Sequence, residues 1–370
     1  MRKGRKMEHK LSRRGFFQLT GGAAGLLAAG RRVLGQEPAA PQPPVLQPIR
    51  DFGRRSTVAL VQGGSRRKNA CDALAAIEDQ VLPVLKRKKY VIIKANNVSS
   101  VNQLAATHAE ALHGILDFLA PRFKGPVIIA ESGPENTLVG FDNFHYAAVA
   151  AEHKAQQVSL LDLNIEGKYE AIGVLNADLH VVPVRLAARL LDTEAYIICS
   201  AILKTHNVVV ATLSVKNMTL GAPLRSAPKE TPRWNDKRHY HYGVRQTHYD
   251  MLLTAQKMAP FWGATLIDGF EGMEGNGPGS GIPVPHRVAI ASTDYIAADR
   301  VGVEVMGVNP AWLGYLNFCH QVGLGQYDLS KIDIRGTKPA TVVRKYQLHT
   351  DIERQLQWMG PMTELPPKLG

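Results

Sequence analysis

Four basic side chains are placed where they could hold an anion together. Lys94 ends one β-branched run, Lys204 and His206 directly follow a second, and Lys216 comes shortly afterwards. These groups could bind a carboxylate or a phosphate, and His206 is the one expected to exchange protons near neutral pH. A lone lysine at a strand end is more often a solvated cap, so the hypothesis depends on the set.

A glycine-rich segment supplies carboxylates. Asp268, Glu271 and Glu274 follow an apolar run and alternate with glycines that include Gly275 and Gly277. The carboxylates could serve as acid and base beside the lysines or ligate a hard divalent cation, and the glycines would let a ligand approach the backbone. The spacing departs from the GxGxxG pattern, so a dinucleotide loop is not favoured, and a plain surface loop is the alternative.

Three histidines form a weaker candidate for a metal site. His239 and His241 would share one face of an extended segment, and His248 and Asp250 follow. Such a set suits zinc or another transition metal. A solvated loop, or a loop that covers a ligand, is the favoured alternative.

Several chemistries are excluded by what the sequence lacks. It contains no GxSxG, HExxH or GxxxxGK[ST] motif, which argues against serine esterases, zincins and P-loop NTPases. Cys71, Cys199 and Cys319 make no CxxC pair, so we expect no four-cysteine iron–sulfur cluster and no cysteine-based zinc site. Three buried thiols are favoured over a single disulfide.

The elements that must position these residues follow an α/β pattern. Short β-branched runs alternate with helical stretches, which predicts a mainly parallel sheet flanked by helices in three layers, with long polar loops at the strand carboxyl ends. Ligands bind at that edge of such sheets. Strands are expected at residues 57–61, 90–94, 126–130, 158–163, 180–184, 195–200, 263–268, 287–292 and 331–335.

Helices and two long loops complete the expected fold. Thr107 begins a capping-box pattern, and Asp294 is placed to cap a helix. Both long loops are polar and rich in aromatics, histidines, glycines or prolines. Helices are expected at residues 69–85, 107–119, 141–153, 186–191 and 295–306, and loops at 221–249 and 269–285.

The first residues are typical of an export signal. Arg13 and Arg14 precede two phenylalanines and a Gly/Ala-rich run too short to span a bilayer. We expect a twin-arginine signal at residues 1–35, a Pro-rich linker at 36–55, one α/β domain at 56–336 and a C-terminal extension at 337–370. An uncleaved anchor or a disordered basic tail is the alternative.

Export implies partners and a compartment. The translocase of the twin-arginine route and a signal peptidase would act on the chain, which would work in the periplasm or elsewhere outside the cytoplasm, with no stable membrane span after cleavage. Residues 1–35 carry nine basic residues and one acidic residue, so the formal charge falls from +12 to +4 without them. That charge is too small to indicate nucleic-acid binding, whereas an anionic small molecule remains an expected partner.

In several of its motifs the chain resembles a known family, the domain of unknown function 362 (DUF362). The family has no settled activity, and the cluster-binding cysteines of its ferredoxin-fused relatives are missing here, so the resemblance implies no iron–sulfur redox role. The resemblance and the positions of the strand ends together give two sets of candidate site residues. The candidate catalytic residues are Lys204, His206, Lys216, Asp268, Glu271 and Glu274. The candidate ligand-binding residues are Lys94, Asn96, Glu131, Asn217, Gly275 and Gly277. The motifs are residues 91–96, 202–206, 213–218, 268–278 and 291–299, within a resemblance that spans about residues 57–336.

Two functions fit these observations. The first is an exported enzyme whose Lys/His/carboxylate pocket acts on an anionic small molecule, with or without a divalent metal. The second is a non-catalytic protein that binds an anion or assists another exported redox protein. Turnover of a bound anion would separate them.

Overall fold

The structure, a computed structural model, describes residues 54–360. The expected signal at 1–35, the linker before residue 54 and residues 361–370 lie outside the described residues. Residues 337–360 pack on the α/β domain, where Tyr346 and Leu356 are each 2% exposed. No helix within 54–360 is long and apolar enough to cross a bilayer.

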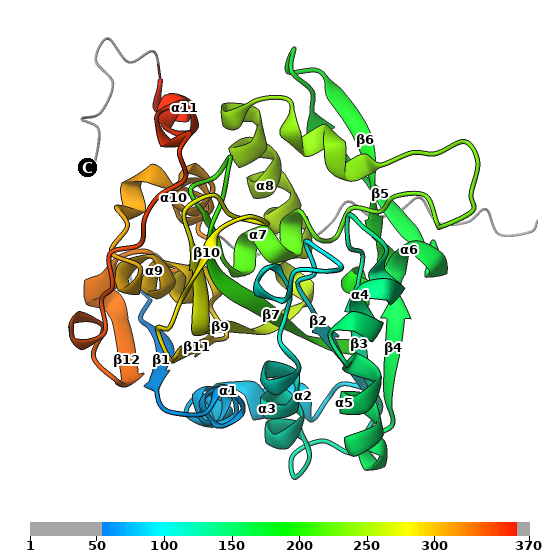
Figure 1. Ribbon diagram of the computed structural model, residues 1–370, viewed down its shortest axis with the longest axis vertical. Coiled ribbons are helices and arrows are strands. Elements are labelled where there is room, and N and C mark those ends of the chain that lie inside the picture. The colour runs from blue at the N-terminus through cyan, green and yellow to red at the C-terminus, as the bar shows by residue number, and fades with distance from the viewer. Residues whose placement is uncertain (1–53, 361–370) are drawn as a thin grey trace, which may run out of the picture. The chain divides into compact units, whose positions relative to one another are not determined.

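A ten-stranded sheet organises the domain (Figure 1), and it confirms the predicted α/β class. Its main path runs β12-β1-β11-β9-β7-β2-β3-β4, in which β11 alone is antiparallel to its neighbours. The short strands β8 and β10 pair with β7 and β9. The strands are β1 (Ser56–Gln62), β2 (Tyr90–Lys94), β3 (Val127–Glu131), β4 (Val158–Asp162), β7 (Ala195–Thr205), β8 (Ala211–Thr212), β9 (Trp262–Glu274), β10 (Ile282–Val284), β11 (Val288–Ser292) and β12 (Ile332–Gly336).

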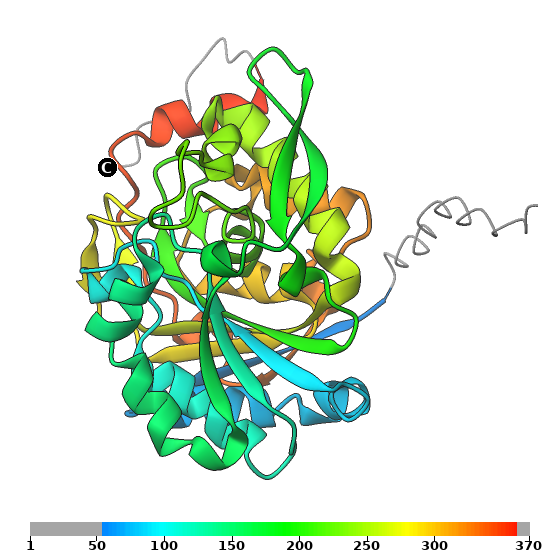
Figure 2. The same cartoon turned by 90° about the vertical axis from the view of Figure 1, so that its right-hand side faces the viewer.

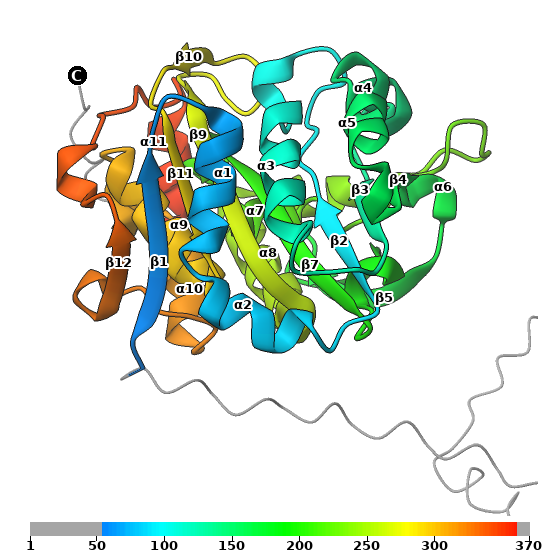
Figure 3. The ribbon, with the colours of Figure 1, turned by 90° about the horizontal axis from the view of Figure 1, so that it is seen from below.

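Helices cover both faces of this sheet. In Figure 3 α1, α2 and α3 lie on one face, and α7 to α10 lie behind it on the other. Each layer closes its own apolar core, one containing Leu74 and Leu116 and the other Met251 and Val301. The helices are α1 (Arg66–Ala75), α2 (Glu78–Leu85), α3 (Ala109–Leu119), α4 (Thr137–Asn143), α5 (Tyr146–Glu152), α6 (Leu163–Glu166), α7 (Ser214–Thr219), α8 (Val244–Met258), α9 (Tyr295–Val305), α10 (Gly314–Gln321) and α11 (Ile352–Gln355).

The parallel strands around β7 bring buried polar residues together at one edge of the sheet. All of its residues are buried, as expected for a central strand covered on both faces. Lys94 of β2 is in register with Cys199 of β7 and Ala130 of β3. The parallel strands β2, β3 and β7 therefore deliver the residues at their carboxyl ends to a common region.

Two expected helices are broken in the structure. The segment 69–85 forms α1 and α2, separated at Ala76 and Ile77. The segment 141–153 forms α4 and α5, because His145 between them has a positive φ of 61°. Apolar periodicity continues across both breaks, so it did not reveal them.

Four further segments differ from the expectation. Residues 186–191 end a strand and form a 3₁₀ helix rather than an α-helix. The long loop expected from residue 221 ends early, because α8 begins at Val244, and β9 extends to Glu274 to pair with β10. A separate hairpin of β5 (Tyr169–Leu175) and β6 (Val181–Ala187) is seen at the upper edge of Figure 2. Only its second strand was predicted, at residues 180–184.

Helix caps give one confirmed prediction and one correction. Asp294 Oδ1 accepts hydrogen bonds from the N–H groups of Ile296 and Ala297, both at 3.1 Å, as expected of an N-cap. The cap of α3 is His108 rather than Thr107, because His108 Nδ1 accepts from the Glu110 N–H at 3.1 Å. Thr107 Oγ1 instead accepts from the Asn96 N–H at 2.8 Å.

All three cysteines are free thiols, with Cys199 and Cys319 buried and Cys71 partly buried. Cys199 and Cys319 agree with the favoured interpretation of buried thiols, whereas Cys71 is less buried than expected.

Candidate functional site

A cavity of about 230 Å³ lies at the carboxyl edge of the parallel strands. We call it the lysine pocket, because Lys216 and Lys237 line it and Lys94 and Lys204 are buried beside it. Glu131 is the one carboxylate among its lining residues. They are Asn96, Asn97, Val98, Glu131, Ser132, Pro134, His206, Asn207, Lys216, Asn217, Leu220, Gly221, Lys237, His241 and Pro278.

A buried ion pair anchors the wall of the pocket. Lys94 Nζ, on a side chain with no exposed surface, donates to Glu131 Oε1 at 2.7 Å. Glu131 also accepts from the N–H groups of Ser132 at 2.7 Å and Asn97 at 2.8 Å. Pairing and hydrogen bonding of this kind offset the cost of burying the two charges. Glu131 is therefore committed to Lys94 and to the backbone.

Two asparagines connect this pair to a second buried lysine. Lys204 Nζ donates to Asn96 Oδ1 at 2.8 Å and to the Ala105 carbonyl at 3.2 Å. Asn96 Nδ2 donates to Asn217 Oδ1 at 2.9 Å, and Asn217 Nδ2 donates to the Ser200 carbonyl at 3.2 Å. Burial, helped by the charge of Lys216, lowers the pKa of Lys204 well below its usual range.

Lys216 differs from its neighbours because its ammonium has no hydrogen-bond acceptor among the described residues, although the residue is only 8% exposed. Burial and the charge of Lys94 lower the pKa of Lys216 to about 8. Lys237, by contrast, donates to Ser132 Oγ at 3.0 Å and to the Gly221 carbonyl at 3.1 Å. Lys216 is thus the cation of this pocket that lacks a partner.

His206 is a neutral hydrogen-bond donor in this setting. Its Nδ1 accepts from the N–H groups of Val208 at 3.0 Å and Val209 at 3.3 Å, which leaves the proton on Nε2. Burial, together with the charge of Lys216, lowers the pKa of His206 well below its usual range. Lys216, with a pKa of about 8, is therefore the better candidate for proton exchange, and the expectation that His206 exchanges protons there does not fit this environment.

The structure does not bring the three loop carboxylates to the lysines. Asp268 forms an ion pair with Arg66 Nε at 3.1 Å, beneath α1, and burial raises the pKa of Asp268. Glu274 Oε2 accepts from the Gln347 N–H at 2.9 Å, and Glu271 is exposed. None of the three is among the residues that line the pocket.

Gly275 and Gly277 shape the loop that closes one side of the pocket. Gly275 has a φ of +75°, and its carbonyl accepts from Thr205 Oγ1 at 2.9 Å. A Cβ on Gly277 would lie 2.2 Å from the Thr205 carbonyl oxygen. The glycines therefore let the loop rest on the end of β7 and place Pro278 in the pocket wall.

The three candidate metal-binding histidines lie in different surroundings. His241 is at the rim of the lysine pocket, where its Nδ1–H donates to the Lys237 carbonyl at 2.9 Å. His239 Nδ1 contacts the Tyr242 hydroxyl at 3.3 Å. His248 is fully buried and accepts from the Tyr315 N–H at 3.1 Å. They do not form a common ligand set within the described residues.

Sequence reasoning missed Lys237 and Ser132. Both are buried in the pocket wall, and they hydrogen-bond to each other. Lys237 belongs to a 3₁₀ helix, Asp236–His241, in the polar stretch expected to be a solvated or ligand-covering loop. Its one sequence signal is the adjacent Asn235, whose side chain caps that helix through the Lys237 N–H at 3.1 Å.

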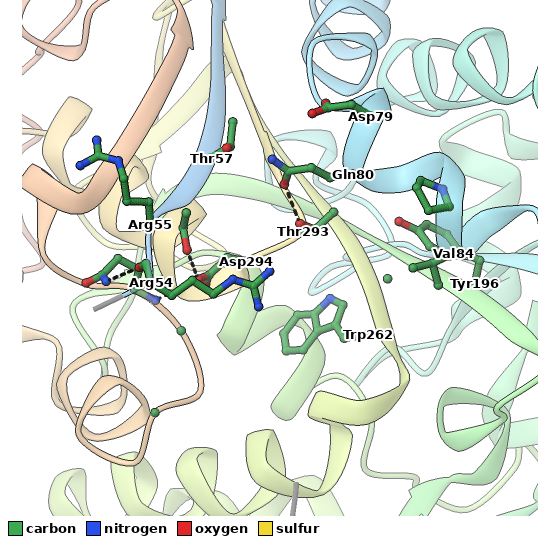
Figure 4. Close-up of a pocket in the computed structure, with 16 residues that line it drawn as sticks. Arg54, Arg55, Thr57, Asp79, Gln80, Val84, Tyr196, Trp262, Thr293 and Asp294 are labelled. Atoms are coloured by element: carbon green, nitrogen blue, oxygen red, sulfur yellow. Dashed lines mark hydrogen bonds between the residues drawn. The ribbon is translucent and has the colours of Figure 1, made fainter. Parts of the chain in front are cut away.

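A larger cavity of about 450 Å³ lies at the opposite, amino-terminal edge of β1, β7 and β9 (Figure 4). Several of its polar side chains are already hydrogen-bonded to one another, although the Tyr196 hydroxyl and the Trp262 indole N–H, which also line it, have no partner among the described residues. Ser56 Oγ donates to Asp294 Oδ2 at 2.6 Å. Thr293 Oγ1 donates to Gln80 Oε1 at 3.0 Å, as a dashed line in Figure 4 shows. The smaller lysine pocket, with its unpartnered ammonium, is the better candidate.

Comparison with known proteins identifies a family and a distant structural similarity. Residues 91–304 match the model of the family described as Domain of unknown function (DUF362), a range that contains every residue lining the lysine pocket. No curated protein matches the chain. A crystal structure of a Thermotoga maritima protein, from the Northeast Structural Genomics Consortium, is similar to this chain with a TM-score of 0.42 and 10% sequence identity. The similarity covers 71% of this chain and 60% of the Thermotoga maritima chain.

Proposed function

Because the chain belongs to the DUF362 family, a domain of unknown function, we infer its function from the site. We propose an enzyme that binds a small anion in the lysine pocket and exchanges a proton with it through Lys216. The observation that carries this proposal is the buried Lys216 ammonium without an acceptor. A buried cation without a partner is costly, and an anionic ligand would supply the missing acceptor.

The pocket's chemistry defines the class of ligand. Glu131 already bonds to Lys94, so the Lys216 ammonium and the His206 Nε2–H are donors left for a ligand. Both suit the oxygens of a carboxylate, sulfate or phosphate. A volume of about 230 Å³ is below the roughly 300–1,000 Å³ of drug-sized sites, which indicates a small anion.

Proton exchange is the reaction that Lys216 can support. A pKa of about 8 leaves both its protonated and neutral forms populated near neutral pH, which is what a general acid or base requires. The neutral His206 can donate a hydrogen bond to an oxygen that becomes negative. We assign no metal to this pocket, since Glu131 is committed to Lys94 and His206 Nδ1 to the backbone.

A non-catalytic anion-binding protein is the second candidate, supported by the rigid wall. Protein acceptors hold Lys94, Lys204 and Lys237 in place, so the pocket is organised before a ligand binds. Such a binder would need Lys216 only for its charge. A substrate that is turned over distinguishes the enzyme from the binder.

A thermal-shift screen of the purified chain tests the proposal. We expect sulfate, phosphate or small carboxylates to raise the melting temperature saturably, since a ligand present at 100 times its Kd stabilises by about 2.7 kcal/mol. Larger nucleotides should have less effect. Failure of every small anion to stabilise the chain would contradict the proposal, and NMR of a stabilising anion would reveal turnover.

Export by the twin-arginine route is a further part of the proposal. It is supported by Arg13 and Arg14 before the Gly/Ala-rich run. Replacing both arginines by lysine should retain the full-length chain in the cytoplasm, because the translocase would no longer recognise the signal. Cell fractionation measures this, and Lys3→Arg is the control. Equal export of the double variant and the unchanged chain would contradict this route.

A further inference from the structure

We propose that His113, Glu152 and His153 form a binding site for a divalent metal ion of the zinc type, between α3 and α5 and outside the lysine pocket. This is the one group of at least three potential metal ligands among the described residues whose ligand atoms lie within 4.8 Å of one another. The inference is independent of the proposed function, because none of these residues lines the pocket.

The distances match a metal centre. His113 Nδ1 lies 3.0 Å from His153 Nε2, and Glu152 Oε1 lies 3.7 Å and 4.0 Å from these two atoms. A point equidistant from the corners of that triangle is about 2.1 Å from each atom, as zinc–nitrogen bonds of about 2.0–2.1 Å and zinc–oxygen bonds of about 2.0–2.2 Å require. Ligand atoms of a tetrahedral zinc ion are about 3.4 Å apart, so the three side chains would have to move by roughly half an ångström to hold it.

The outer contacts point the lone pair of His153 toward this centre. Gln156 Nε2 donates to the Leu116 carbonyl at 3.0 Å, which turns Gln156 Oε1 toward His153 Nδ1 at 2.9 Å. His153 therefore carries its proton on Nδ1 and presents a free lone pair at Nε2. Metal-bound histidines commonly have such a partner on the other ring nitrogen. In His113 the proton would move from Nδ1 to Nε2 as the metal binds.

The site is open to solvent on one side and has a second carboxylate near it. The histidine side chains are 10% and 9% exposed, whereas the Glu152 side chain is 51% exposed and opens the site to solvent. Asp117 Oδ1 lies 3.9 Å from His153 Nε2 and would be the nearest fourth ligand, but it already accepts from Arg67 Nη2 at 2.8 Å and would have to leave that bond. Two histidines and a carboxylate with an open position form a ligand set that binds zinc.

Arg67 is the competing cation. Its Nη1 donates to Glu152 Oε1 at 2.8 Å, and its Nε donates to Asp117 Oδ2 at 2.6 Å. A metal ion must share these carboxylates with the guanidinium or displace it. Without metal, the direct hydrogen bond between the two imidazoles holds the pair together.

Zinc titration of the EDTA-treated full-length chain tests the proposal. We expect one Zn²⁺ per chain by calorimetry, a higher melting temperature with Zn²⁺, and a Co²⁺ absorption spectrum typical of nitrogen and oxygen ligands. His113→Ala and His153→Gln should each abolish stoichiometric binding, and circular dichroism checks their folding. His180→Ala, at an exposed hairpin position, and Lys216→Met, in the lysine pocket, should bind as the unchanged chain does.

Removing Arg67 gives a second measurement. Arg67→Met should tighten Zn²⁺ binding by about tenfold or more, because a positive charge beside both carboxylates is lost. The proposal is overturned if the unchanged chain binds no stoichiometric Zn²⁺, if folded His153→Gln binds as well as the unchanged chain, or if Arg67→Met binds more weakly.

Discussion

Replacing Lys216 by Met should weaken the binding of a small anion by about 10- to 150-fold, because a hydrogen bond to a charged group contributes about 1.5–3 kcal/mol. The substitution keeps the length of the side chain and removes its charge. Any turnover of the anion should be lost with it, since the proton-exchanging group is gone. Calorimetry with a stabilising anion measures the affinity, and NMR of that anion measures turnover.

The folded state of this variant should be intact. Lys216 has no hydrogen-bond acceptor among the described residues, so its loss leaves no protein group unpaired. Lys229→Met, at an exposed position, is the matched control and should leave binding unchanged. An unaltered affinity in Lys216→Met would mean that the anion binds elsewhere.

Glu131→Gln should lower the free energy of unfolding by about 3–5 kcal/mol, because breaking a buried ion pair leaves Lys94 as an uncompensated buried charge. The Gln amide keeps only one acceptor oxygen, so either the Ser132 N–H or the Asn97 N–H would also lose its acceptor. Urea unfolding measures the difference. The double variant Lys94→Met/Glu131→Gln should recover part of the loss, since the stranded charge is then absent.

A surface ion pair provides the control for this prediction. Glu170 accepts from Lys257 at 2.7 Å, with side chains 47% and 37% exposed. Glu170→Gln should cost about 1 kcal/mol or less. A similar small cost for Glu131→Gln would contradict the role assigned to the buried pair.

The sheet was predictable because its strands carry the signal that burial requires. The apolar run before Lys204 and the one before Lys94 indicate buried parallel strands, and the structure places both in the middle of the sheet. Helix breaks were not predictable in the same way. The positive φ of His145, for example, interrupts a segment whose apolar pattern does not change.

The site was predictable to the extent that it depends on strand ends. Lys94, Lys204 and Glu131 meet because parallel strands end at one edge of the sheet. Asp268 does not join them, because side chains alternate along β9 and Asp268 faces Arg66 of α1. Lys237 reaches the pocket through tertiary packing of a 3₁₀ helix, for which the sequence carries no periodic signal.

The coupling of anion binding to proton uptake tests the central claim most directly. Lys216, with a pKa of about 8, is mostly neutral near pH 9, and a bound anion should raise its pKa so that it takes up about one proton. Calorimetry with sulfate in buffers of different ionisation enthalpy measures this uptake. For the unchanged chain we predict uptake of about one proton per bound anion near pH 9 and little uptake near pH 6. The Lys216→Arg variant should take up no proton at this position, because arginine stays charged at both pH values. Binding without proton uptake near pH 9, or equal uptake in Lys216→Arg, would contradict the account.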